Sequence, residues 1–281
     1  MKMTQLGLIC SFLALAIQAN ASEQLSRYKQ AKAVMKTYAE MKDYTQAEKD
    51  YCYQIARDSS SGGMCAYLAQ QADVAAFVTQ YKKTKKFIQD VIKDDEKMID
   101  FKRTVHAAVV AGSQYIADRC AVEMNEWYGG SGAGAAHAGC MSRNLKSGTA
   151  KLVAIDRILG KNDQELAASE RGQFEEIELK DLEQYVENSS DGIAGAIEVA
   201  VSKIDSEMDH LDNATRREIK KDLIKSQGSF IAFRDKHCLA ITSLLYPQVT
   251  VRNAKNISKS IAYCSNELNQ ERLRLLEGQD N

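Results

Sequence analysis

The chain has 281 residues, of which 44% are apolar and 27% charged, and it contains a single proline. This composition is typical of a folded helical protein and excludes a disordered one, because so much apolar surface would not stay solvated. The 37 lysines and arginines against 38 aspartates and glutamates leave a net charge of -1. A protein that follows nucleic-acid phosphates carries a basic excess, so we expect no nucleic-acid partner.

Residues 1–21 have the layout of a secretory signal peptide. Lys2 precedes an apolar run over residues 6–17, and Ala19 and Ala21 supply small residues at the -3 and -1 positions of a cleavage site. The run is shorter than the roughly 20 apolar residues of a membrane span, and no later stretch is long enough. We predict cleavage before Ser22, export to the periplasm and no integral membrane span in the mature chain. Retention of the leader as an anchor is the alternative.

The cysteines agree with an exported protein. Removal of the leader removes Cys10 and leaves six, and an even count in an exported chain indicates disulfides. A metal site is the alternative, but the chain has no CxxC motif and its four histidines are scattered. The six fall into three near pairs that enclose residues 59–63, residues 129–132 and Pro247, which are rich in turn formers. We therefore predict the bridges Cys52–Cys65, Cys120–Cys140 and Cys238–Cys264.

Apolar residues recur at three- and four-residue steps along much of the chain, which predicts long amphipathic helices and an all-α fold without strands. The acidic run 94–96 is expected on the solvated face of the first helix. Asp212 and Asn213 predict a helix start, and Pro247 predicts a helix end. The four stripes are Val74, Phe77, Val78, Tyr81, Ile88, Val91, Ile92 and Ile99; Ile193, Ile197, Val201, Ile204, Met208 and Leu211; Ile219, Leu223, Phe230, His237, Ile241 and Leu244; and Ile257, Ile261, Cys264, Leu268 and Leu275.

The two later cysteine pairs lie in similar surroundings. In both, a helix approaches a cysteine, a loop follows, and a second cysteine opens the returning helix. This repetition predicts two related helical units, residues 22–160 and residues 176–281, joined by the polar stretch 160–176. Independent convergence of two disulfide-bonded hairpins is the alternative.

The second unit carries a longer pattern around its cysteines. In chain order the pattern is Leu223, Gln227, Phe230, Phe233, Arg234, Asp235, Cys238, Cys264, Arg272 and Leu276. It resembles the lysozyme-inhibitor LprI-like family, although that family usually has Trp at the position of Phe230 and often Gly-Gly-Ser in the loop. The first unit has Gly-Gly-Ser at 129–131, but Ile116 and Ala117 replace the Arg and Asp. The resemblance implies an exported helical hairpin closed by a disulfide and, as in some members, inhibition of lysozyme.

The charged residues of this pattern favour a structural role. Adjacent helix residues do not face each other, so Arg234 and Asp235 are each expected to pair with another helix or with the hairpin loop, with Arg272 as a partner for Asp235. On this interpretation Asp235→Ala lowers stability more than binding. A direct charged contact with a partner protein is the alternative.

The glycine-rich loop is the candidate interaction site. It comprises Trp127, Tyr128, Gly129, Gly130, Ser131 and Gly132. Small residues let backbone enter a narrow cleft, and the two aromatic residues are suited to anchor an interface. The favoured interpretation is nevertheless a plain hairpin loop, with the two aromatics capping the core. A nucleotide site is disfavoured because no strand precedes the glycines.

No catalytic, cofactor-binding or metal-binding residue is predicted. The histidines lack HExxH or triad spacing, no serine stands in GxSxG, and every cysteine of the mature chain is assigned to a bridge. We therefore predict a non-enzymatic module that binds a protein partner in the cell envelope, either lysozyme or a membrane-complex subunit of a secretion system. An enzyme acting on peptidoglycan is a third hypothesis. Loss of Lys2 leaves 36 positive against 38 negative residues, which gives no overall acidic excess to favour basic lysozyme.

Overall fold

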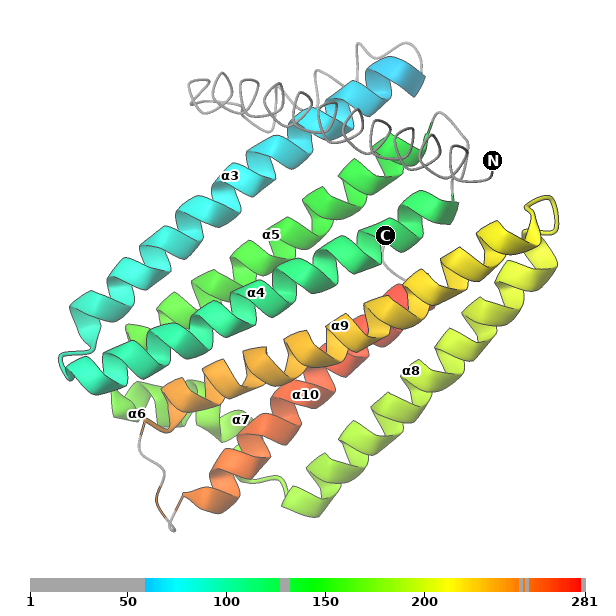
Figure 1. Cartoon of the computed structure of the whole chain (residues 1–281). Coiled ribbons are helices and arrows are strands. Elements are labelled where there is room, and N and C mark those ends of the chain that lie inside the picture. Colours follow the sequence, from blue (N-terminus) through cyan, green and yellow to red (C-terminus); the bar gives the residue numbers. More distant parts are fainter. Residues whose placement is uncertain (1–58, 127–131, 248–249, 251–252, 279–281) are drawn as a thin grey trace, which may run out of the picture. The chain divides into compact units, whose positions relative to one another are not determined.

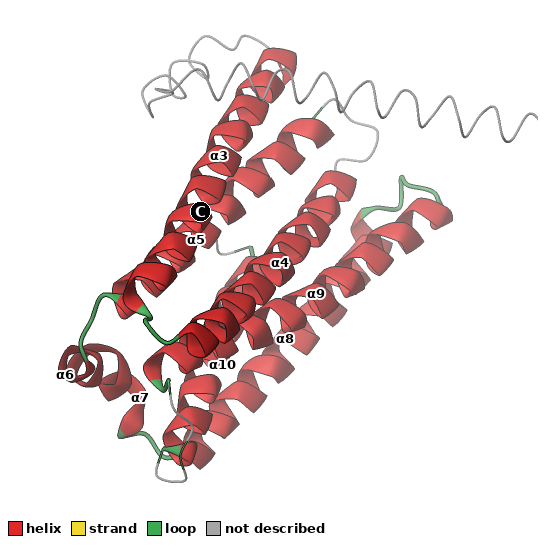
Figure 2. Ribbon diagram, turned by 60° about the vertical axis from the view of Figure 1, so that its left-hand side comes forward, coloured by secondary structure: helices red, strands yellow, loops and turns green. Residues whose placement is uncertain are grey.

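The computed structural model describes residues 59–126, 132–247, 250 and 253–278 (Figure 1). These residues are helical apart from short connections, and no strand occurs among them (Figure 2). The predicted all-α fold is thereby confirmed. The predicted leader, the Cys52–Cys65 bridge and Trp127, Tyr128, Gly129, Gly130 and Ser131 of the candidate loop lie outside the described part of the chain.

The first three described helices are α3 (Ser59–Val91), α4 (Asp95–Glu126) and α5 (Ala133–Leu159). The prediction of one continuous helix through residues 74–99 is wrong, because α3 ends at Val91 and α4 begins at Asp95. Asp94 accepts a hydrogen bond from the backbone N of Lys97 at 3.0 Å, so this carboxylate satisfies a free amide at the start of α4. The acidic run therefore starts a helix, and Ile99 is exposed instead of lying in the core.

The start of α3 corrects a second expectation. Residues 59–63, which are rich in serine and glycine and were predicted as a turn, form the first turn and a half of α3. Intrinsic helix propensity is a weak guide that tertiary packing often overrides, and α3 packs along α5.

The polar connection between the two predicted units is itself mostly helical. It contains the short helices α6 (Asp163–Leu166), η1 (Ala167–Arg171) and α7 (Gly172–Glu175). Leu166 and Phe174 from this connection are buried in the same apolar cluster as Ile155 of α5.

The second half contains α8 (Leu179–Glu207), α9 (Asn213–Leu245) and α10 (Ala254–Leu276). Asp212 caps α9 as predicted, since its Oδ1 accepts hydrogen bonds from the backbone N of Ala214 at 2.8 Å and of Thr215 at 2.9 Å. These bonds hold the pKa of Asp212 below its usual value. Helix α9 ends two residues before Pro247, which confirms the predicted stop.

The packing of the long helices has the same order in each half. Helix α3 packs on α5, α8 packs on α10, and α4 packs along α9 between the two halves (Figure 1). This repeated order supports the predicted duplication, which stays a prediction. None of the described helices combines the length and apolar character that crossing a bilayer requires.

Two of the three predicted disulfides are confirmed. Cys120–Cys140 joins α4 to α5, and Cys238–Cys264 joins α9 to α10, each with the two Cα atoms 5.5 Å apart. The first bridge is buried, and the amide of Asn144 donates to the carbonyl oxygen of Cys140 at 2.8 Å beside it. Disulfides of this kind persist in oxidising compartments, so the chain belongs to an oxidising environment.

Candidate functional site

The residues of the sequence pattern gather where α9 meets α4 and α10. The ring of Phe230 meets Tyr115 of α4 edge-on at 5.5 Å between centroids, and the ring of Phe233 stacks on Tyr115 at 5.8 Å. Phe230 is buried, and Leu223 and Leu276 pack in an adjoining apolar cluster. These positions hold the helices together.

Arg272 is buried in this aromatic cluster, and among the described residues no carboxylate pairs with it. Its guanidinium lies over the rings of Tyr115 and Phe230, 5.6 and 5.9 Å from their centroids. It donates to Ser226 Oγ at 3.1 Å, and to Gln227 Oε1 and Tyr115 Oη at 3.4 Å each. Burial lowers the pKa of Arg272. The predicted pairing of Arg272 with Asp235 is wrong, because Arg272 points into the helix interface instead.

Arg234 and Asp235 also differ from their prediction. Arg234 donates from Nε and Nη2 to Asp235 Oδ1 at 3.0 and 2.9 Å, although the two residues are adjacent on α9. The long arginine side chain folds back along the helix to reach its neighbour. Arg234 also reaches α10, where Nη1 donates to Asn269 Oδ1 at 3.2 Å, so its predicted contact with another helix is confirmed. The Asp235 side chain is 57% exposed, which removes the reason to expect a large stability cost on its loss.

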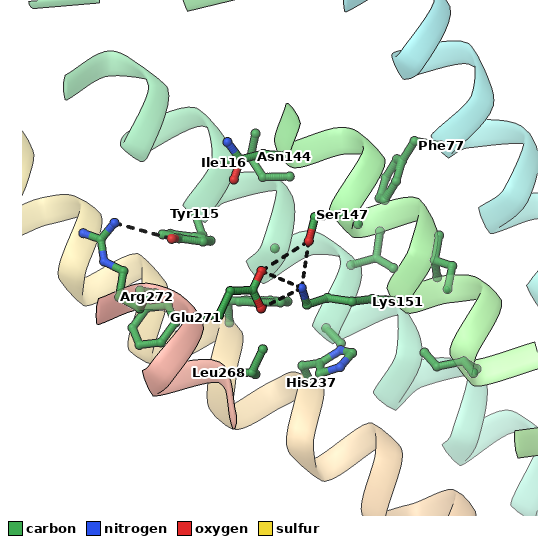
Figure 3. A pocket seen from close by; sticks show the side chains of 18 of the residues that line it. Phe77, Tyr115, Ile116, Asn144, Ser147, Lys151, His237, Leu268, Glu271 and Arg272 are labelled. Carbon is green, nitrogen blue, oxygen red and sulfur yellow. Dashed lines mark hydrogen bonds and ion pairs between the residues drawn. The ribbon is translucent and has the colours of Figure 1, made fainter. Parts of the chain in front are cut away.

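A cavity of about 60 Å³ lies inside the bundle between α3, α4, α5, α9 and α10. Its wall is mainly apolar and includes Phe77, Val105, Phe233, Leu268 and Leu275. Figure 3 shows the side chains that converge on it from the two halves of the chain. Because the space is small and the wall apolar, the cavity suits at most a few small apolar groups.

A polar cluster lies on one side of this cavity. Lys151 of α5 donates to both carboxylate oxygens of Glu271 of α10 at 3.0 Å and to Ser147 Oγ at 2.8 Å (Figure 3). His237 of α9 lines the same cavity, and burial together with the charge of Lys151 lowers its pKa to about 4. The histidine is therefore neutral near pH 7, and the ion pair ties α5 to α10.

Sequence reasoning missed Lys151 and Glu271. They lie 120 residues apart, and the spacing of Ser147 from Lys151 occurs on any helix. No local signal was present, because only the packing of α5 against the second half brings these side chains together. His237 belongs to a predicted helical stripe, and it is partly buried in the structure.

The contact between α4 and α9 is reciprocal. A Cβ added to Gly112 would lie 3.2 Å from the ring of Phe233, and Tyr115 touches Phe230. When the sequence around Cys120 is aligned with that around Cys238, Gly112 corresponds to Phe230 and Tyr115 corresponds to Phe233. The contact between Gly112 and Phe233 therefore corresponds to the contact between Phe230 and Tyr115, with the two helices exchanged. Such exchange is the mark of a two-fold interface. The missing side chain at Gly112 leaves room for the aromatic residues of the other half.

Helices α4 and α9 also form a groove on the surface of the bundle. The α4–α9 groove is lined by His106, Ala107, Val110, Ala111 and Gln114 of α4 and by Gly228, Ser229, Ala232 and Lys236 of α9. Val110 is 53% exposed, and Ile224 and Ile231 on either side of Gly228 are 61% and 41% exposed. The groove therefore offers small and apolar surface to solvent.

An ion pair lies beside this groove and links its two helices. Lys225 of α9 contacts Asp118 Oδ1 of α4 at 2.9 Å, and Ser229 and Gln114 donate to the same carboxylate. Burial raises the pKa of Asp118, but these three partners more than offset it, and the pKa lies below its usual value. The charged Asp118 thus fixes the relative position of α4 and α9.

Of the candidate loop, the structure describes Gly132 alone. Gly132 precedes α5, and its carbonyl oxygen accepts from the backbone N of Ala136 at 2.9 Å. The role of Trp127, Tyr128 and the glycines before Gly132 stays a prediction. In the described part of the chain, no group of three or more His, Cys, Asp or Glu side chains is arranged to hold a metal ion.

Comparison with known proteins adds no relative. No protein-family model, curated protein or solved structure matches this chain.

Proposed function

We propose that this protein is a non-enzymatic scaffold of the bacterial periplasm that binds another protein of the cell envelope. The two described disulfides and the signal-peptide pattern of residues 1–21 support export. The six long helices of the described part form one frame, because a disulfide joins two helices within each half and α4 packs along α9 between the halves.

The observation that carries this proposal is the exposed apolar surface of the α4–α9 groove. Val110 lines the groove and is 53% exposed, and the glycine, alanine and serine residues of its wall leave a depression in which side chains of a partner fit. Contiguous exposed apolar surface is typical of protein-binding sites. A groove between two helices suits an amphipathic helix, which buries its apolar face there.

The charge of the groove bears on the choice of partner. Among the residues that the structure describes, Lys236 and His106 line it, and no carboxylate does. A strongly basic protein such as lysozyme gains no electrostatic complement here, so the groove favours a helix of an envelope-complex subunit. Lysozyme inhibition, which the resemblance of the second unit implies, is the second candidate. A turbidity assay with purified protein and lysozyme separates the two.

The test uses matched surface variants of the full chain. We expect the double variant V110E/A232E, at two exposed positions that line the groove, to lose a specific partner that co-purifies with the wild-type protein from envelope extracts. The control is V153E, because Val153 on α5 is 41% exposed but does not line the groove. Retention of the same partner by V110E/A232E, with the helical content unchanged, would contradict the proposal.

A further inference from the structure

Helix α3 carries a cluster of positive charge on its solvent side. Lys82, Lys83, Lys85 and Lys86, here called the lysine face, are all exposed. The opposite side of α3 buries Thr84 and Ile88, which fixes the outward direction of the lysines. None of these lysines forms an ion pair with a described residue; Lys85 lies over the ring of Tyr81 at 5.6 Å.

Helix α8 carries the opposite charge on its solvent side. Its sequence contains seven carboxylates and only two lysines, Lys180 and Lys203. Five of the carboxylates form no ion pair in the described part of the chain and are fully on the exposed side; the acidic face consists of Asp181, Glu183, Glu187, Asp191 and Glu198. The helix turns Leu182, Ser189 and Ile193 inward instead.

The two faces cannot neutralise each other within one molecule. Helix α3 packs on α5 and α8 packs on α10, and Figure 1 shows α3 and α8 at opposite edges of the helical array. Rows of like charge repel one another along each helix, and an opposite charge from outside relieves that repulsion.

We propose that the lysine face of one copy docks on the acidic face of a second copy. On both faces the charges recur every four residues, about 6 Å apart along the helix, as in Lys82 and Lys86 or Glu183, Glu187 and Asp191. Exposed Val78 lies one turn from Lys82, and exposed Tyr185 lies one turn from Asp181, so apolar surface borders each face.

This contact is head to tail, because the two surfaces that meet are different. Each copy that docks through its lysine face keeps its acidic face free for another copy, so the association continues beyond a pair unless the rotation closes a ring. The contact does not use the α4–α9 groove, and it does not depend on the function proposed above.

Sedimentation velocity of the full chain tests the proposal. In about 10 mM salt, where charges act over about 30 Å, we expect the weight-average sedimentation coefficient to rise with protein concentration. In about 1 M salt, where the range is about 3 Å, the chain should sediment as a monomer. A variant with the lysine face reversed, K82E/K83E/K85E/K86E, and a variant with the acidic face reversed, E183K/E187K/D191K, should each stay monomeric in low salt.

Mixing the two reversed variants gives the decisive result. The reversed α3 of one is acidic and the reversed α8 of the other is basic, so an equimolar mixture should associate again. Circular dichroism melting serves as the folding control, and these exposed substitutions should leave it nearly unchanged. A wild-type chain that is monomeric in low salt overturns the proposal. The acidic face would then be free to bind a cationic partner other than a second copy. Association that survives in either variant alone, or a mixture that stays monomeric, overturns it as well.

Discussion

Arg272 is a buried cation held by aromatic rings and neutral oxygen atoms. Its donors reach Ser226, Gln227 and Tyr115, so loss of the side chain leaves these groups with unfilled space and fewer partners. We expect Arg272→Ala to lower the free energy of unfolding by about 2–4 kcal/mol. Urea denaturation followed by circular dichroism measures the change.

Asp235→Ala is the matched comparison for Arg272→Ala. Its exposed ion pair with Arg234 contributes little, so we expect a change of less than about 1 kcal/mol. Similar costs for the two variants would refute the assignment of Arg272 to the core and Asp235 to the surface.

His237 makes the fold sensitive to acid. Its pKa is about 4 in the folded chain, below its ordinary value of 6.5, so the folded state favours the neutral ring. This contribution to stability is complete above pH 6.5 and is lost as the pH falls toward 4, because the unfolded chain then binds the proton first. Between these pH values we expect the wild-type melting temperature to fall more steeply than that of His237→Gln. Parallel curves would show that His237 does not titrate in this way.

At the scale of single helices, two glycines distinguish tight from open packing. A Cβ at Gly148 of α5 would lie 3.0 Å from the ring of Phe77, whereas one at Gly195 of α8 has nothing within 4 Å. Alanine in an open helix position gains about 0.5–1 kcal/mol over glycine. We expect Gly195→Ala to show this gain and Gly148→Ala to show less or a loss, as measured by thermal melting. An equal gain at both positions would mean that α3 and α5 are less closely packed than described.

The disulfides act on pairs of helices. Cys238–Cys264 closes a segment with a sequence separation of 26, and removal of a bridge of this kind costs about 3 kcal/mol through the freedom of the unfolded chain. We expect C238S/C264S to lose about that much in chemical denaturation while it keeps its helical content. A loss of helical signal under native conditions would instead mean that α10 requires the bridge in order to fold.

At the scale of the whole molecule, the sequence predicted what depends on local pattern. The all-α class, the cap at Asp212, the stop at Pro247 and two sequential bridges follow from periodicity, turn residues and cysteine spacing. The break at Asp94 was missed because the apolar stripe continues across it. The partners of Arg272 and the pair Lys151–Glu271 were missed because they depend on how one helix is rotated against another, which a stripe several residues wide does not determine.

The account as a whole depends on the α4–α9 groove as the surface that meets another protein. Site-specific photo-crosslinking in cells tests this most directly, with the crosslinker placed at Val110 in the groove and at Val153 on α5, which are 53% and 41% exposed. We predict that the probe at 110 yields a discrete crosslinked species and that the probe at 153 does not. No product at 110, or the same product from both positions, would contradict the account.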